Sequence, residues 1–170
     1  MRKVLWMSVF IFMCGVVFLG ASVFALDFLD LCVSGTPEEV KKAIEAGVDV
    51  NARDERDYTP LMWAVRYNPN SEVTKILIDA GADVNAKGER GYTPLMWAVR
   101  YDKASPEIVK LLLDAGADVN AVSQFCETAL DQTIDEQKVE LLIKRGAKKG
   151  QEICFGKPYG EVLSIISSGK

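Results

Sequence analysis

Large apolar residues recur along the chain with helical spacing. Three segments each contain two adjacent apolar residues, and a residue three positions before the first of them lies on the same helix face. These are Leu77–Ile78 with Thr74, Leu112–Leu113 with Val109, and Leu142–Ile143 with Val139. Residues three and four positions apart line one side of a helix, so the pattern predicts amphipathic helices with one buried stripe. A glycine, which favours the left-handed conformation at helix ends, follows each apolar segment: Gly47, Gly81, Gly116 and Gly146.

Residues that cap helix N-termini stand before the predicted helices. Two first helices are expected to begin at Thr59 and Thr93, each followed by a proline that fits the first helical position. The second helices are expected to begin at further capping residues, namely Thr36, Asn70, Ser105 and Asp135. The chain is therefore predicted to form pairs of helices joined by short loops.

The helix pairs belong to an internal repeat. Residues 58–67 return residue for residue as residues 92–101, and residues 80–86 return as residues 115–121. Thr59 and Thr93 are 34 positions apart, and Thr93 and Thr128 are 35 apart. A period of this length predicts stacked units that bury their apolar faces only against one another.

The repeated motif Thr-Pro-Leu-x-x-Ala, followed by an apolar second helix and Gly-Ala-Asp-Val-Asn-Ala, resembles the ankyrin repeat. The resemblance covers residues 27–150 and is strongest in the two central units. It implies an all-α repeat solenoid in which each unit is a helix–loop–helix plus a β-hairpin. We expect about three full repeats between two partial caps, with residues 159–167 as a last helix. Met62 and Met96 replace the family's usual histidine and are expected to pack in the core.

Residues 1–25 form a segment of a different kind. Arg2 and Lys3 precede an uncharged apolar stretch that ends in Val23–Phe24–Ala25, which is the pattern of a secretory signal peptide cleaved after Ala25. The ankyrin-repeat domain is then residues 26–170, located in the periplasm or secreted. The alternative is an uncleaved anchor in the inner membrane, because the stretch is long enough to span a bilayer.

Composition argues against catalysis and against nucleic acid as the partner. The formal net charge is −4 and histidine is absent, which removes the commonest general base and metal ligand. An acidic chain disfavours nucleic-acid binding. The sequence contains no phosphate-binding glycine loop and no metal-ligand spacing. We therefore expect no enzyme, no catalytic, cofactor-binding or metal-binding residue, and no small-molecule substrate.

Three cysteines lie outside the N-terminal segment: Cys32, Cys126 and Cys154. Export makes a disulfide possible. Neighbouring repeats, however, stack about 10 Å apart, and a disulfide needs Cα atoms within about 7 Å. We therefore expect Cys126 and Cys154 to be unbridged and Cys32 to be a buried thiol.

Side chains repeated in the two central units are the candidate partner contacts. In ankyrin repeats the hairpins and first helices line a concave groove, and tyrosine, tryptophan and arginine are typical interface hot spots. The candidates are Tyr58, Trp63, Arg66, Tyr67, Tyr92, Trp97, Arg100 and Tyr101. We expect the tyrosines to be exposed to a partner. For the tryptophans we favour the alternative of stacking between repeats. The arginines are either partner contacts or lie over aromatic faces.

The charged loop tips, residues 53–57 and 87–90, are expected to be solvated surface. Together these features predict an exported, bacterial-type module that binds another protein, as an inhibitor, adaptor or protective partner of an envelope protein. The alternatives are a membrane-anchored structural scaffold and a secreted host-directed effector. The membrane is a partner only if residues 1–25 are retained.

Overall fold

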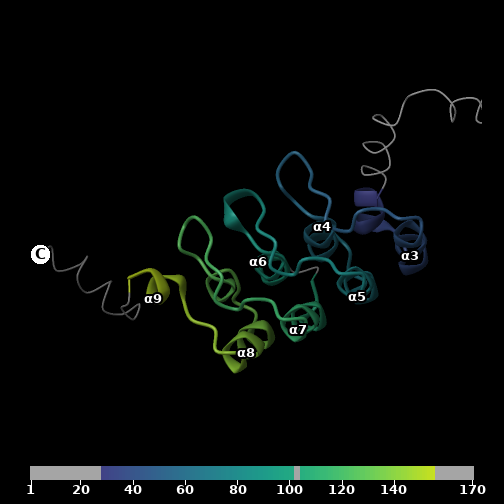
Figure 1. Ribbon diagram of the computed structural model, residues 1–170. Coiled ribbons are helices and arrows are strands. Elements are labelled where there is room, and N and C mark those ends of the chain that lie inside the picture. The colour runs from purple at the N-terminus through teal and green to yellow at the C-terminus, as the bar shows by residue number, and fades with distance from the viewer. Residues whose placement is uncertain (1–27, 102–103, 156–170) are drawn as a thin grey trace, which may run out of the picture.

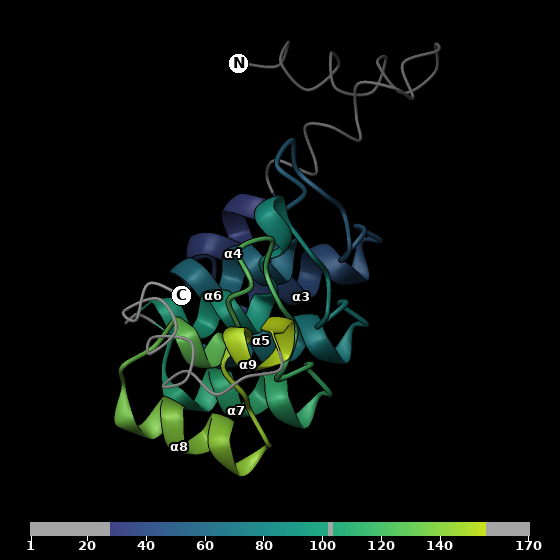
Figure 2. The same ribbon diagram turned by 90° about the vertical axis from the view of Figure 1, so that its left-hand side faces the viewer.

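The computed structural model describes residues 28–101 and 104–155. Helices of successive units stack side by side with nearly parallel axes (Figures 1 and 2). The predicted signal segment, residues 1–25, and the predicted last helix, residues 159–167, lie outside the described residues. None of the helices in the described ranges has the length and apolarity that a membrane span requires.

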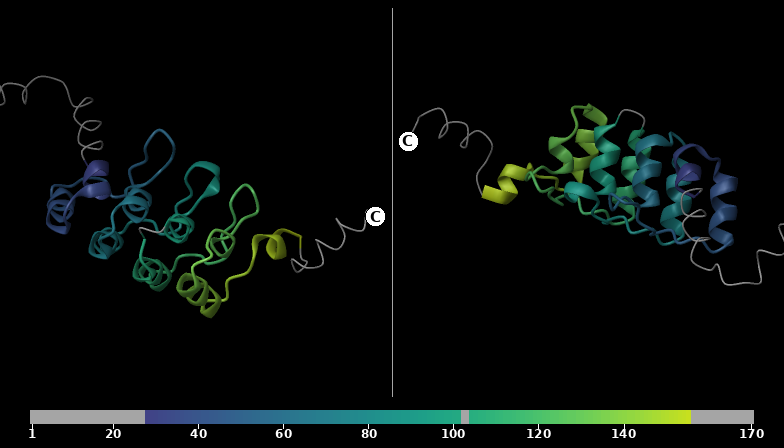
Figure 3. Two further views of the ribbon diagram at one scale, coloured as in Figure 1. Left: turned by 180° about the vertical axis from the view of Figure 1, so that it is seen from behind. Right: turned by 90° about the horizontal axis from the view of Figure 1, so that it is seen from above.

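The helices form two rows. The inner row contains α4 (Pro60–Tyr67), α6 (Pro94–Arg100) and the short η3 (Ala129–Asp131). The outer row contains α3 (Pro37–Glu45), α5 (Ser71–Asp79), α7 (Pro106–Asp114) and α8 (Glu136–Lys144). Residues 28–34 are also helical and precede α3. The loops between units, one of which carries η2 (Glu89–Gly91), project from the inner row, and α9 (Gly150–Phe155) follows α8 (Figures 1 and 3).

The predicted capping residues begin the helices. The Thr59 hydroxyl accepts a hydrogen bond from the Met62 amide at 3.4 Å, and Thr93 caps Met96 in the same way. The outer helices begin directly after Thr36, Asn70, Ser105 and Asp135. The four glycines that follow the outer helices have φ between +79° and +90°. Both sets of helix boundaries are therefore confirmed.

The core lies between the two rows of helices. Its largest fully buried side chains come from inner and outer helices alike: Leu61, Met62, Leu77, Leu95, Met96, Ile108, Leu112 and Leu142. The burial of Met62 and Met96 confirms the predicted apolar packing at the motif position that usually carries histidine. At the N-terminal end of the described stack, Glu39 and Lys42 are exposed, as expected of a partial cap.

Asparagine side chains join each unit to the next. The Asn51 amide donates to the Gly81 carbonyl at 3.0 Å, and its oxygen accepts from the Asp83 N–H at 2.8 Å. The same two bonds recur further along the stack: Asn85 with Gly116 and Asp118, and Asn120 with Gly146 and Lys148. We call these three residues the asparagine clamps. Each clamp binds only backbone atoms of the following unit.

Two local features differ from the predicted units. The loops fold back like hairpins, but no strand occurs within the described ranges. Successive loops share one backbone hydrogen bond each, from Glu89 to Arg56 at 3.2 Å and from Gln124 to Arg90 at 2.9 Å, which is too little for a ladder. In the fourth unit, the first helix is reduced to the single turn η3, Ala129–Asp131.

The loop after α4 supports the first unit. The buried Asn68 side chain donates to the carbonyls of Cys32 and Gly35 at 3.3 and 3.1 Å. These carbonyls lie at the end of the helical segment 28–34, where backbone acceptors lack partners within the helix. Cys32 is fully buried, as predicted, and burial raises the pKa of its thiol to about 12.

The C-terminal end contradicts the prediction for the cysteines. Cys126 and Cys154 form a disulfide, with their Cα atoms 6.3 Å apart. Gly150 explains the close approach, because a Cβ there would lie 1.7 Å from the Cys126 carbonyl oxygen. Only a residue without a side chain lets α9 pack this closely on the preceding loop. The spacing between full repeats therefore does not apply to this final turn.

Candidate protein-interaction surface

The structure brings all eight candidate residues together on the inner helices and their loops. Within α4, Trp63 stacks on Tyr67 with ring centroids 5.4 Å apart, and Trp97 of α6 stacks on Tyr101, directly after the helix, at 5.6 Å. Tyr58 links the two groups, since its ring makes edge contacts with Trp63 at 5.9 Å and Trp97 at 5.5 Å. The repeated aromatic residues therefore form one continuous cluster across two units.

Two of the tyrosines are not exposed, so the prediction was wrong for Tyr58 and Tyr92. Only 8% of Tyr58 and 6% of Tyr92 are accessible. The Tyr58 ring lies over Gly88 of the next loop, where a Cβ would be 2.6 Å from the ring. Its hydroxyl donates to Glu89 at 3.4 Å, and the Tyr92 hydroxyl donates to Glu127 at 3.1 Å.

The pKa values of Tyr58 and Tyr92 are both raised. Burial is the largest cause, because it penalises the charged phenolate. The carboxylates of Glu89 and Glu127 raise the two pKa values further, whereas Arg66 and Arg100 act in the opposite direction. Both tyrosines are therefore structural hydrogen-bond donors that join neighbouring units.

The two tryptophans occupy different environments. Trp63 is partly exposed, and its indole N–H donates to Asp54 at 3.0 Å. Trp97 is 8% accessible, and its indole nitrogen has no acceptor among the described residues. The residue at the position equivalent to Asp54 is Gly88. The predicted stacking between repeats therefore describes Trp97 well, while Trp63 reaches the surface.

Arg66 lies among three aromatic rings from two units. Its guanidinium carbon is 4.7 Å from the centre of Trp97, 4.8 Å from Tyr67 and 4.9 Å from Tyr101. Arg100 lies 5.7 Å from the centre of its own unit's Tyr92. Both arginines therefore lie over aromatic faces, which is one of the two alternatives given for them. The energy of each contact depends on how far water is excluded.

Hydrogen bonds distinguish the two arginines further. The exposed Arg100 donates to the Tyr92 hydroxyl at 3.1 Å and to the Gln132 amide oxygen at 3.4 Å. Gln132 in turn donates to Glu127 at 2.7 Å. Glu127 and Gln132 were not predicted from the sequence. Where the central units carry the repeated tyrosine and tryptophan, the fourth unit carries these two residues, so no repeat pattern marks them.

Five of the eight candidates reach solvent. Arg100 is exposed, and the other four are partly exposed: Trp63, Arg66, Tyr67 and Tyr101. We call these five residues the aromatic–arginine strip. The buried floor beneath the strip is formed by Tyr58, Tyr92 and Trp97. The strip therefore presents rings and guanidinium groups that their neighbours already hold in place.

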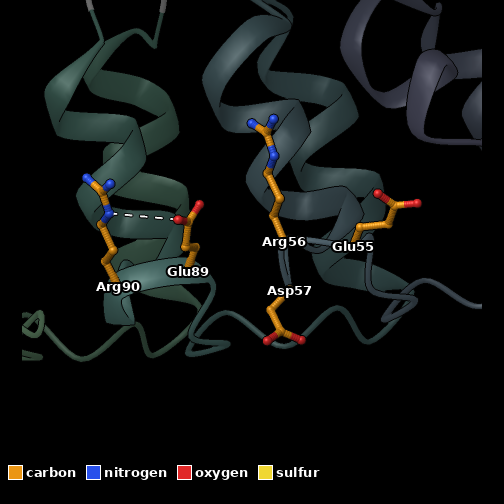
Figure 4. Close-up of a pocket in the computed structure, with 5 residues that line it drawn as sticks. All are labelled: Glu55, Arg56, Asp57, Glu89 and Arg90. Carbon is orange, nitrogen blue, oxygen red and sulfur yellow. Dashed lines mark ion pairs between the residues drawn. The ribbon is translucent and has the colours of Figure 1, made fainter.

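The loop tips form a second surface beside the strip. An open depression of about 610 Å³ is lined by charged residues alone: Glu55, Arg56, Asp57, Glu89 and Arg90 (Figure 4). Arg90 pairs with Glu89 at 3.8 Å, and Arg53 pairs with Asp57 at 3.9 Å, both with exposed side chains. The predicted solvated surface is confirmed here. Small-molecule pockets are mostly apolar, so this depression is a poor match for one.

Metal ligation has no counterpart in the described part of the chain. No group of three or more cysteine, aspartate or glutamate side chains there is placed to hold a metal ion. The acidic residues of the repeated Ala-Asp-Val-Asn segments instead form local turns, in which the Asp83 side chain accepts from the Asn85 amide at 2.9 Å.

Comparisons with known proteins agree with the repeat architecture. A comparison with curated proteins gives no significant match. The family model described as ankyrin repeats, in three copies, matches residues 29–123. This range covers more than half of the chain and includes the whole aromatic–arginine strip. The chain therefore belongs to the ankyrin-repeat family.

Proposed function

We propose that this chain is an exported protein-binding module that acts through the aromatic–arginine strip and has no catalytic activity of its own. Ankyrin repeats are protein-interaction modules, and stacked repeats present extended binding surfaces. We further propose an inhibitor, adaptor or protective partner of an envelope protein as its role.

The strip is the observation that carries this proposal. It combines partly exposed tryptophan, tyrosine and arginine side chains on one face of α4 and α6, and these residue types dominate binding hot spots. Ring stacking and cation–π contacts already hold them in place. Side chains that are ordered before binding lose less conformational entropy when a partner arrives.

Two observations support export. Residues 1–25 have the charge and apolarity of a signal peptide, and the Cys126–Cys154 disulfide fits an oxidising compartment. Intact-mass analysis of the protein from its native host tests this point. A mature chain that begins at Leu26 supports a soluble exported module, whereas retention of residues 1–25 favours the membrane-anchored scaffold.

Affinity capture from the native envelope fraction tests the binding function. The double variant Tyr67→Ala/Tyr101→Ala is expected to weaken binding of the captured protein by about 2 kcal/mol or more, as truncation of hot-spot residues does. Glu39→Lys, on the outer face of the first unit, is the matched control and is expected to bind normally. Equal binding by the wild type and the double variant would contradict the proposal.

A further inference from the structure

We infer that Arg66 is a carboxylate-binding subsite within the aromatic–arginine strip and receives an aspartate or glutamate side chain of the partner protein. This inference rests on the proposed function and adds the chemistry of the partner at one point. It follows from the arrangement of rings, hydrogen bonds and charges around Arg66.

The aromatic rings hold the Arg66 guanidinium without satisfying its donors. The ring centres of Trp97, Tyr67 and Tyr101 lie within 4.9 Å of its central carbon, but ring faces attract the charge of a guanidinium and do not satisfy its in-plane N–H donors. The described residues give Arg66 neither a hydrogen bond nor an ion pair. Its Nε atom is buried without an acceptor, but the side chain as a whole is partly exposed, so the terminal N–H groups are the part within reach of a partner.

The neighbouring acids are already engaged. Three carboxylates on the inner face accept hydrogen bonds from side chains of the strip or its floor: Asp54 from Trp63, Glu89 from Tyr58, and Glu127 from Tyr92. Arg66 therefore lies at the centre of this face as a cation without an acidic partner among the described residues. Charge complementarity then favours an acid supplied from outside.

Arg100 is the equivalent arginine of the next unit, and it forms hydrogen bonds that Arg66 lacks because the surroundings of the two residues differ. Arg100 donates to Tyr92 and Gln132, whereas Arg66 projects over the rings of the following unit. A guanidinium fork pairs with a carboxylate through two parallel hydrogen bonds. The Arg66 guanidinium carries one positive charge, so the single negative charge of a carboxylate fits this position better than a phosphate does.

Peptide selection on the purified chain tests the subsite. Random dodecapeptides are selected against the wild type, and each selected peptide is synthesised with glutamate and with glutamine at its acidic position. We expect the glutamate form to bind at least about tenfold more tightly, as a charge-assisted pair would. Arg66→Met should abolish this difference between the two peptides, and the matched control Arg100→Met should preserve it.

A second measurement uses the wild type alone. In an NMR titration with the selected acidic peptide, the Arg66 Nε–Hε signal is expected to shift with the same saturation curve as binding, while the Arg100 signal moves less. A shift of Arg100 alone, or no shift of either signal, would contradict the assignment. This readout remains valid if Arg66→Met fails to fold.

The outcomes separate the two proposals. Peptides that bind the wild type, lose binding with Tyr67→Ala/Tyr101→Ala, and show no preference for glutamate would overturn the carboxylate subsite and leave the binding strip intact. Selected peptides whose binding is insensitive to that double variant would overturn both. A glutamate preference that disappears only with Arg66→Met supports both.

Discussion

Residues 58–67 and 92–101 have the same sequence but not the same surroundings. In the first copy, Trp63 is partly exposed and bonded to Asp54, and Arg66 lies among rings of its own and the next unit. In the second copy, Trp97 is buried and Arg100 is exposed and bonded to Tyr92 and Gln132. The neighbours along the stack, rather than the repeated motif, give each copy its properties.

The different surroundings of Trp63 and Trp97 arise from the units and loops that adjoin them. Trp97 has a full unit before it, whose Tyr58 packs over Gly88 and against the indole. No ring contact from a preceding unit is made with Trp63 in the described structure. A repeat therefore supplies a position, and the preceding and following units determine whether that position is core or surface.

The largest expected difference between the copies concerns the tryptophans. Trp97→Ala should lower the free energy of unfolding by about 3–5 kcal/mol, because it removes a buried ring at the junction of two units. Trp63→Ala should cost only about 1–2 kcal/mol, since part of the ring is already in water. Urea denaturation of both variants measures the difference, and equal losses would show that the two environments are energetically the same.

A third loop extends the comparison to the disulfide. The same position in three successive loops is occupied by Asp57, Gly91 and Cys126. Of these three, Cys126 is linked to another side chain, through its disulfide with Cys154. Cys126→Ser/Cys154→Ser is expected to destabilise the chain by about 2–4 kcal/mol. Hydrogen exchange should accelerate first in residues 121–155, because stacked units are coupled mainly to their neighbours.

The matching control for the disulfide is chemical. A reducing agent should lower the melting temperature of the wild type to that of the double variant and leave the double variant unchanged. Uniform acceleration of hydrogen exchange across α4 and α6 would contradict the local effect.

The floor tyrosines give a smaller difference and a pH dependence. Tyr92→Phe should cost about 1–2 kcal/mol and Tyr58→Phe less, because the Tyr92 hydroxyl bonds to both Glu127 and Arg100. Both pKa values are raised in the fold, so the neutral form is favoured. Their contribution is fully present below about pH 10, the ordinary tyrosine value, and is lost as the pH rises through the folded pKa.

Urea denaturation between pH 7 and 11 checks this dependence. The wild type should lose stability above about pH 10, and the double variant Tyr58→Phe/Tyr92→Phe should lose less. Identical slopes for the two proteins would rule out these hydroxyls as the cause.

The smallest expected effect concerns Asp57 and Gly91, which directly precede the two copies of the ten-residue segment. Asp57 has φ of +62° and Gly91 has φ of +75°, a region in which residues with a Cβ are strained. Asp57→Gly should stabilise the chain by at most about 0.5–1 kcal/mol, and Gly91→Ala should destabilise it by a similar amount. Melting curves of both variants measure the change, and a shift in the opposite direction for either would refute the strain.

Local chemistry explains which parts of the fold could be predicted from sequence. Thr59 and Thr93 begin helices because their hydroxyls bond to amides three residues ahead, and this requires nothing from the rest of the chain. Gly81 and Gly116 end helices for an equally local reason. The repeat period then determined the stacking order.

Contacts between units explain what could not be predicted. The burial of Tyr58 depends on the absence of a side chain at Gly88, and the disulfide depends on the same property of Gly150. Both glycines lie in other segments of the chain, and the motif itself contains no sign of them. The eight candidate residues were thus found together, but their division into strip and floor required the structure.

The asparagine clamps have a consequence for how the number of repeats can change. Because Asn51, Asn85 and Asn120 bond only to backbone atoms of the following unit, any inserted copy of a whole unit would offer the same carbonyl and amide to the residue before it. A break within a unit would instead leave a clamp without its partners. Gain or loss of whole units therefore preserves the clamps, and two copies of an identical ten-residue segment, 34 positions apart, are what such a gain leaves in a sequence.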